Sequence, residues 1–231
     1  MTTAARPWIE CYLWGDGDAT SPVFSQRAKC VEGAATSDKY LSAPVTLTAA
    51  LDEWTAAFTA VCADSYSWTW NRSTNRITIG NTGTNFALTI PNSLPSVLGF
   101  TASAMSGASS FTGTLAPRGF APLLAVECDP VEDAGEIQLL EFRSGRSSAP
   151  AFSNKEIVRV VVTVAAANVD ALLSCCGAGR VRLHLTGSTS ALAEAALGGY
   201  VDGWIQTART VEVLGASEDY HRIELEIARS V

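Results

Sequence analysis

The 231-residue sequence predicts an α+β fold that is rich in β-strands. One segment, residues 48–63, places large apolar side chains three or four residues apart, which is the spacing of one helix face. Most other patterned segments alternate apolar and polar residues, as half-buried antiparallel strands do. We therefore expect a helix plus an antiparallel meander in an N-terminal module. A second, mostly antiparallel β domain with one or two helices should follow.

The predicted helix covers residues 48–63. Its apolar face is formed by Leu51, Trp54, Phe58, Val61 and Cys62. We expect Thr48 to be the N-cap, since a threonine hydroxyl can accept a hydrogen bond from a free backbone N–H of the first turn. Asp52 and Glu53 are expected in that first turn, where the helix dipole favours acidic side chains.

Three short strands are expected after the helix, over residues 66–70, 76–79 and 85–90. Polar segments at 71–75 and 81–84 separate them and have the composition of turns. Tight turns of this kind join neighbouring antiparallel strands, so we predict a three-stranded meander. The helix can then cover its apolar face.

The module is expected to close with a short helical turn. Ser93 can cap this turn, and Pro95 fits its first residues, where a missing N–H costs little. Gly99 is expected to adopt a left-handed conformation. Phe100 can then fold back onto Leu94, as in a Schellman-type helix end.

Composition changes along the chain predict four segments. Residues 1–40 form an irregular arm with a short strand near Trp8, and residues 41–100 form the helix-and-meander module. Residues 101–119, rich in Ser, Ala, Gly and Thr, are expected to be a linker or long loop. Residues 120–231 form the second domain. Its expected strands cover 122–128, 136–142, 157–164, 181–185, 200–206, 210–214 and 220–228, and its expected helices cover 165–176 and 190–198.

Charge and hydropathy narrow the classes of partner. The chain holds 16 Lys and Arg against 23 Asp and Glu, a net charge of −7, and has no basic patch. Nucleic-acid binding is therefore disfavoured.

No apolar run approaches the ~18 residues of a membrane span. We see no signal peptide, so the protein is expected to be made and kept in a cytoplasm or released by lysis. The six cysteines form no regular framework and are expected to be free thiols.

The sequence predicts no catalytic, cofactor-binding or metal-binding residues. A hydrolase would have to use His184 or His221, the only histidines, or the acidic residues of segment 127–136. A calcium-loop spacing begins at Asp16, but Arg27 stands where the closing carboxylate is needed. Whether the acidic loop 127–136 binds calcium stays open, as does whether the N-terminal arm is ordered alone.

Aromatic residues on one strand face admit two interpretations. Tyr66, Trp68 and Trp70 could stack on a carbohydrate, or they could form the core beneath the predicted helix, which we favour. The residues that we expect to have structural roles are Leu51, Trp54, Phe58, Trp68, Trp70, Phe86, Leu88, Ile90, Leu94, Gly99 and Phe100.

Three segments carry a resemblance to a known class of proteins. LDEWTAAFTAV, YSWTWNRSTNRITIG and FALTIPNSLPSVLGF, within residues 45–100, resemble a helix-and-strand module of tailed-bacteriophage structural proteins. The C-terminal half is similar in style to phage tail and baseplate domains. The resemblance is one of pattern, and it implies a non-enzymatic virion protein of the tail tip, baseplate or neck.

The partners implied are copies of the chain in a ring and other virion proteins. No cofactor or nucleic acid is implied, and a host surface glycan is a secondary possibility. The alternatives are a capsid decoration protein or carbohydrate-binding module and, less favoured, a hydrolase.

Overall fold

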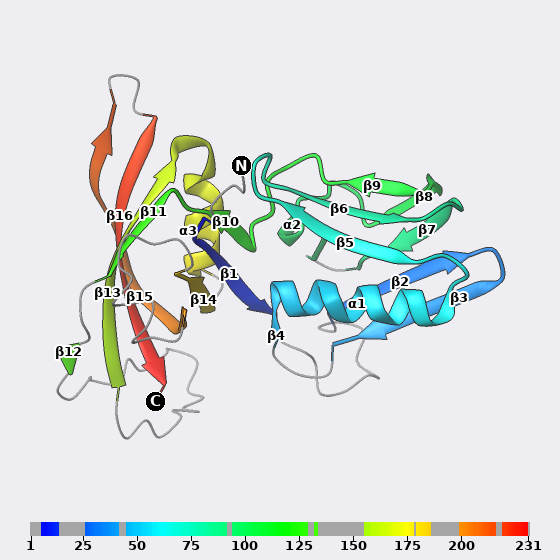
Figure 1. Ribbon diagram of the computed structural model, residues 1–231, viewed down its shortest axis with the longest axis horizontal. Coiled ribbons are helices and arrows are strands. Elements are labelled where there is room, and N and C mark those ends of the chain that lie inside the picture. The colour runs from blue at the N-terminus through cyan, green and yellow to red at the C-terminus, as the bar shows by residue number, and fades with distance from the viewer. Residues whose placement is uncertain are drawn as a thin grey trace. The chain divides into compact units, whose positions relative to one another are not determined.

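A computed structural model describes residues 6–13, 26–41, 45–91, 94–128, 132–133, 155–177, 179–185, 199–215 and 219–230. These residues form antiparallel sheets and three α-helices, which confirms the predicted β-rich α+β class (Figure 1). The chain divides into two compact units. Unit 1 comprises residues 1–7, 123–166 and 183–231, and unit 2 comprises residues 8–122 and 167–182.

Helix α1 of unit 2 spans Leu47–Val61. Its N-cap is Thr46, whose hydroxyl accepts a hydrogen bond from the Ala49 N–H, so the expected cap at Thr48 is wrong. The reason is that Thr48 already has a partner: its N–H and hydroxyl both donate to the buried Glu10 carboxylate, each at 2.7 Å. Because the helix begins earlier, its first turn contains no acidic residue, contrary to expectation.

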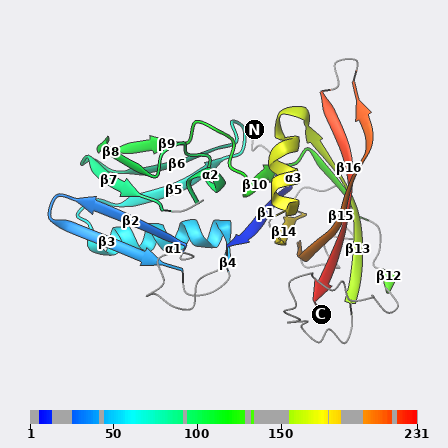
Figure 2. The same cartoon turned by 180° about the vertical axis from the view of Figure 1, so that it is seen from behind.

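Two small sheets complete most of unit 2. The first has the order β3-β2-β7-β8, formed by Ala35–Tyr40, Arg27–Glu32, Phe86–Thr89 and Ala104–Ala108. The second has the order β5-β6-β9, formed by Tyr66–Asn71, Arg76–Asn81 and Ser110–Thr112. The views in Figures 1 and 2 show α1 running along these strands.

The predicted three-stranded meander is therefore wrong in its third strand. Only β5 and β6 pair as expected, whereas β7 pairs with β2 and β8. The chain is redirected after β6 because Asp64 accepts a hydrogen bond from the Thr84 N–H and the Asn81 amide donates to the Thr84 carbonyl. These contacts hold the turn in a shape other than a tight hairpin.

Two segments that were predicted to be irregular contain ordered strands. Residues 101–119, expected as a linker, contain β8 and β9. Residues 1–40, expected as an irregular arm with one short strand, also contain β2 and β3. Small residues do not exclude pairing here, since β9 brings Phe111 against Phe86, with ring centroids 5.0 Å apart.

The remaining elements of unit 2 lie around β1 (Trp8–Leu13), which pairs with β10 (Phe120–Pro122) and β4 (Val45–Thr46). A 3₁₀ turn over Ala166–Asn168 precedes helix α3 (Val169–Gly177), where a single helix over 165–176 was expected.

The core of unit 2 contains the residues that were expected to have structural roles. Aromatic rings dominate it: Trp54 lies 4.9 Å from Trp68, and Phe58 lies 5.7 Å from Tyr66, between ring centroids. Of the expected set, Trp70 alone is half-buried, and its ring stacks on Phe120 at 4.5 Å. The buried members are Leu51, Trp54, Phe58, Trp68, Phe86, Leu88, Ile90, Leu94, Gly99 and Phe100.

The short helix α2 (Leu94–Val97) ends as the sequence predicts. Gly99 has φ of 80°, in the left-handed region. The Phe100 N–H donates to the Pro95 carbonyl at 2.8 Å, and the Gly99 N–H donates to the Ser96 carbonyl at 3.3 Å. These two bonds form a Schellman motif. The expected cap Ser93 lies outside the described residues.

Unit 1 contains an antiparallel sheet in which the order β15-β16-β13-β11 is continuous. These strands are Tyr200–Leu214, Tyr220–Ser230, Lys155–Ala165 and Ala125–Cys128, and β12 (Glu132–Asp133) also pairs with β13. Strand β14 (Arg180–His184) contains the boundary between the units. The two strands expected over 200–206 and 210–214 are one strand, β15. The strand expected at 136–142 and the helix expected at 190–198 lie outside the described residues.

One face of the unit 1 sheet is apolar and buried. It carries Val158, Val160, Val162 and Val164 of β13, together with Ile223, Leu225 and Ile227 of β16. The alternate residues of these strands form the opposite face, which is more polar and more exposed. None of the helices described is long and apolar enough to cross a membrane.

Candidate interaction surface

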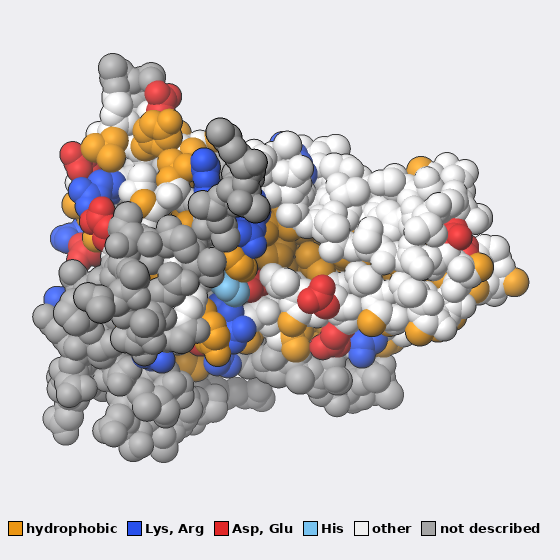
Figure 3. All heavy atoms as spheres, viewed as in Figure 1, with side chains coloured by type: hydrophobic (Ala, Val, Ile, Leu, Met, Phe, Trp, Pro, Cys, Tyr) orange, Lys and Arg blue, Asp and Glu red, His pale blue; other side chains and the backbone are white. Residues whose placement is uncertain are grey.

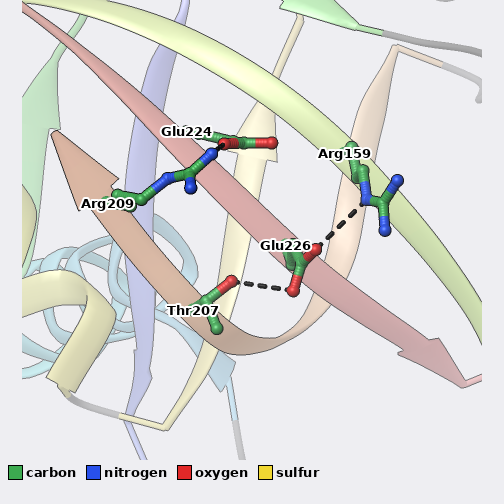
Figure 4. Close-up of polar contacts among 5 residues, drawn as sticks. All are labelled: Arg159, Thr207, Arg209, Glu224 and Glu226. Carbon is green, nitrogen blue, oxygen red and sulfur yellow. Dashed lines mark hydrogen bonds and ion pairs between the residues drawn. The ribbon is translucent and has the colours of Figure 1, made fainter. Parts of the chain in front are cut away.

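Charged side chains from neighbouring strands meet on the polar face of the unit 1 sheet (Figure 4). The strand register sets Arg209 opposite Glu224 and Thr207 opposite Glu226 between β15 and β16, and Arg159 opposite Glu226 between β13 and β16. Opposite residues of an antiparallel pair point to the same face, so these side chains can reach one another.

The contacts on this face are ion pairs between Arg and Glu, together with one hydrogen bond from a threonine hydroxyl. Glu226 accepts from Arg159 Nε at 3.1 Å and from the Thr207 hydroxyl at 2.8 Å, and Arg209 pairs with Glu224 (Figure 4). We call this set, with the pairs below, the charged ladder.

The charged ladder continues at Arg222, which pairs with Glu127 at 2.8 Å and with Glu212 at 3.4 Å. All of these groups are at least partly exposed, so each pair contributes about 1 kcal/mol or less to stability. Such a ladder is better suited to selecting a partner by charge than to holding the sheet together.

The outer part of β15, residues 206–214, extends the polar face into a more exposed ribbon. Residues 206–213 are all exposed, whichever face they point to, and the side chains of Val211 and Val213 are 53% and 44% accessible. Figure 3 shows hydrophobic and charged side chains intermixed over the region where Figure 1 draws β15 and β16. Exposed β-branched residues beside a charged ladder are typical of a surface that contacts another protein chain.

Two register shifts interrupt the pairing of β15 with β16, between Ile205 and Thr207 and between Thr210 and Glu212. Each shift behaves as a β-bulge, which changes the face on which the following residues lie. The second shift puts Arg209 and Glu212 on the same face, although the two residues are three positions apart.

A separate aromatic pocket lies in unit 2. It has a volume of about 160 Å³ and is lined by Trp8, Thr48, Leu51, Asp52, Trp68, Trp70, Arg72 and Phe120. The Arg72 guanidinium carbon lies 3.7 Å from the ring centroid of Trp8 and 5.5 Å from that of Trp70. Burial lowers the pKa of Arg72, and the nearby Glu10 carboxylate opposes that shift. The protein's own cation thus covers aromatic faces that a ligand would use.

The carbohydrate-stacking interpretation required exposed rings on β5. Tyr66 and Trp68 are only 5% and 6% exposed, and Trp68 packs against Trp54 and Phe58 of α1. Their faces are therefore part of the core. Only Trp70 of the three is half-buried, and one of its faces stacks on Phe120.

Of the residues considered for catalysis or metal binding, those that the structure describes are not brought together into one site. His184 lies on β14, and His221 lies on β16 opposite Val164 and Val213. Glu127 of the acidic loop pairs with Arg222, while Asp16, Asp129 and Glu136 lie outside the described residues. Among the side chains that the structure describes, no group of three or more His, Cys, Asp or Glu is arranged to hold a metal ion.

The residues of the exposed ribbon were not singled out from the sequence. The segment TARTVEV, residues 207–213, was divided between an unassigned gap at 207–209 and a second strand that begins at Thr210. The available signal was its high content of Thr and Val, which indicates a continuous strand. Comparisons with models of protein families, with curated proteins and with solved structures found no match for this chain.

Proposed function

We propose that this protein is a structural subunit of a tailed-bacteriophage virion, located in the tail at the tip, baseplate or neck, and that it acts by assembly and not by catalysis. Its partners are copies of itself in a ring and other virion proteins. The single observation that carries the proposal is the ribbon of residues 206–214, which exposes Val211 and Val213 next to the charged ladder. Exposed valines on a sheet edge are an aggregation risk unless another chain covers them.

The charged ladder supports the same proposal. Exposed ion pairs contribute little to the stability of a single chain, but complementary charges orient two proteins and select between partners. The resemblance of residues 45–100 to a phage structural module is independent of this ribbon, since that segment lies in unit 2. The two lines of support thus come from different parts of the chain.

The proposal is tested on virus particles. Antibodies against the purified protein should label the tails of particles from the bacterium that carries this gene, as seen by immunogold electron microscopy. Mass spectrometry of the same purified particles should detect its peptides in several copies per particle. Antibodies preabsorbed with the purified protein are the control. Particles that contain no such peptides, or label confined to the heads, would contradict a role in the tail.

A further inference from the structure

The outer part of β15 has an open edge. On one side, β15 pairs with β16 as far as Leu214. On the other side its neighbour is β14, which is only five residues long. The Leu185 N–H donates to the Gly199 carbonyl at 2.9 Å, which places the end of β14 beside the beginning of β15. Within the described part of the chain, no strand therefore lies along the outer edge of residues 206–214.

The composition of this edge favours pairing with another strand. Residues 206–214 contain no Pro or Lys, two of the residues that commonly protect natural sheet edges. Thr207, Thr210, Val211 and Val213 are β-branched, and such residues have high strand propensity. An edge with these properties is suited to accept a strand from another chain.

The residues of the edge are arranged for pairing with an identical strand. Because of the bulge between Thr210 and Glu212, Arg209 and Glu212 both lie on the face of the charged ladder. Ala208 lies opposite Leu225 and Val213 lies opposite His221, so Ala208 and Val213 both lie on the other face.

We infer that the outer edge of β15 pairs antiparallel with the same edge of a second copy of this chain. In this pairing, Arg209 of each copy lies opposite Glu212 of the other, and Ala208 lies opposite Val213. Each of these pairs combines residues of one face, as opposite residues of an antiparallel pair must. The arrangement has twofold symmetry, because exchanging the copies reproduces every contact.

Charge complementarity selects this register. Within one chain, Glu224 pairs with Arg209, and Arg222 pairs with both Glu212 and Glu127. The proposed pairing joins these two groups across the interface. The resulting row alternates in sign through Glu224, Arg209, the second copy's Glu212 and the second copy's Arg222. A shift that set Arg209 against Arg209 would oppose like charges.

This inference adds a specific contact to the proposed function. Its relevance to a virion rests on that proposal. The inference names one contact, which joins two copies of the subunit; a ring of more copies also needs a second, different contact. Its tests use purified protein, whereas the proposed function is tested on virus particles. The two can therefore fail separately.

The first test is association in solution. Analytical ultracentrifugation of the parent protein should show an average mass that rises above the monomer mass of 24.3 kDa with concentration. The double variant Val211→Lys, Val213→Lys should stay near the monomer mass, since lysine on an edge opposes strand pairing. Both side chains are exposed, so its melting temperature should match that of the parent. The matched control is Val61→Lys, which changes a valine of similar exposure, 51%, on α1 and should associate like the parent.

The second test determines the register. Copies with Ala208→Cys are mixed with copies with Val213→Cys and oxidised with glutathione disulfide. A covalent dimer is expected in the mixture, and not in either variant alone or in the parent. A covalent dimer only from a pair of positions out of this register would overturn the arrangement.

The remaining outcomes also decide the inference. A parent protein that stays monomeric at all concentrations overturns pairing between copies, as does a lysine double variant that associates like the parent. Loss of binding to a different virion protein, with self-association unchanged, would show that the edge receives another chain and would also overturn it. Each of these results leaves the detection of the protein in virus particles unaffected.

Discussion

Replacement of Gly99 by alanine tests the helix end that closes α2. Gly99 has φ of 80°, and a residue with a Cβ pays about 1–2 kcal/mol to adopt that conformation. An added Cβ would also overlap the Leu115 carbonyl oxygen and lie 3.1 Å from the Pro117 nitrogen. Overpacking of this kind costs a further ~1–3 kcal/mol. We expect Gly99→Ala to lower the free energy of unfolding of unit 2 by about 2–5 kcal/mol.

Substitutions at two other glycines separate the cost of the backbone conformation from the cost of crowding. Gly107 has φ of 84°, but its added Cβ would meet no atom within 4 Å, so Gly107→Ala should cost only the ~1–2 kcal/mol of the backbone conformation. Gly113 has no positive φ, yet its Cβ would lie 2.9 Å from the Gly99 carbonyl oxygen. Gly113→Ala should therefore report the crowding alone.

The measurement is chemical unfolding followed by tryptophan fluorescence, with calorimetry as a second readout. Three of the buried or half-buried tryptophans of unit 2, Trp54, Trp68 and Trp70, report its unfolding. The expected loss lowers the melting temperature of unit 2 by roughly 5 °C or more. A parent-like melting temperature for Gly99→Ala would refute the left-handed helix end. Equal losses for Gly99→Ala and Gly107→Ala would refute the close approach of Leu115.

Three further perturbations have outcomes that follow from buried groups in unit 2. Glu32→Ala removes the acceptor of the Tyr66 hydroxyl and of two backbone N–H groups, and should cost about 2–4 kcal/mol in urea unfolding. As a control, Glu53→Ala, which removes a half-exposed carboxylate that pairs with Lys39, should cost less than ~1 kcal/mol. Thr46→Ala removes the cap of α1 and should cost about 0.5–2 kcal/mol in the same assay, while an unchanged value would argue against this cap. Burial, helped by the Glu10 carboxylate, raises the pKa of Cys11 from 9.0 to about 12, so this group's stabilising effect is complete below pH 9 and is lost as pH rises toward 12. Unfolding measured between pH 9 and 11 should therefore depend less steeply on pH in Cys11→Ser than in the parent, and identical slopes would contradict the burial of this thiol.

Local patterns were sufficient for the elements whose signals are local. Leu51, Trp54 and Phe58 form one face at helical spacing, and α1 buries all three. Local sequence does not decide whether Thr46 or Thr48 is the N-cap. The choice depends on Glu10, which is 38 residues away from Thr48 in the sequence and accepts both of its hydrogen bonds. A carboxylate from a distant strand thus fixed the start of the helix.

Strand partners were harder to predict than strands. The alternation of Phe86 and Leu88 identifies β7 correctly, but the same alternation is compatible with pairing to β6 or to β2. Asp64 and Asn81 decide between them by holding Thr84, and neither has a signature in the sequence that distinguishes this role from an ordinary polar turn. Pairing was therefore determined by side-chain contacts that alternation does not record.

The bulge in β15 shows the same limit with a functional consequence. With strict alternation, Arg209 and Glu212 would point to opposite faces, because their positions differ by an odd number. The register shift between Thr210 and Glu212 brings both onto the charged ladder, where Glu224 and Arg222 lie opposite them. Only then can a second copy place its Glu212 against Arg209 while Ala208 and Val213 also meet on a matching face. A single inserted residue thus converts an ordinary sheet edge into one that is complementary to itself.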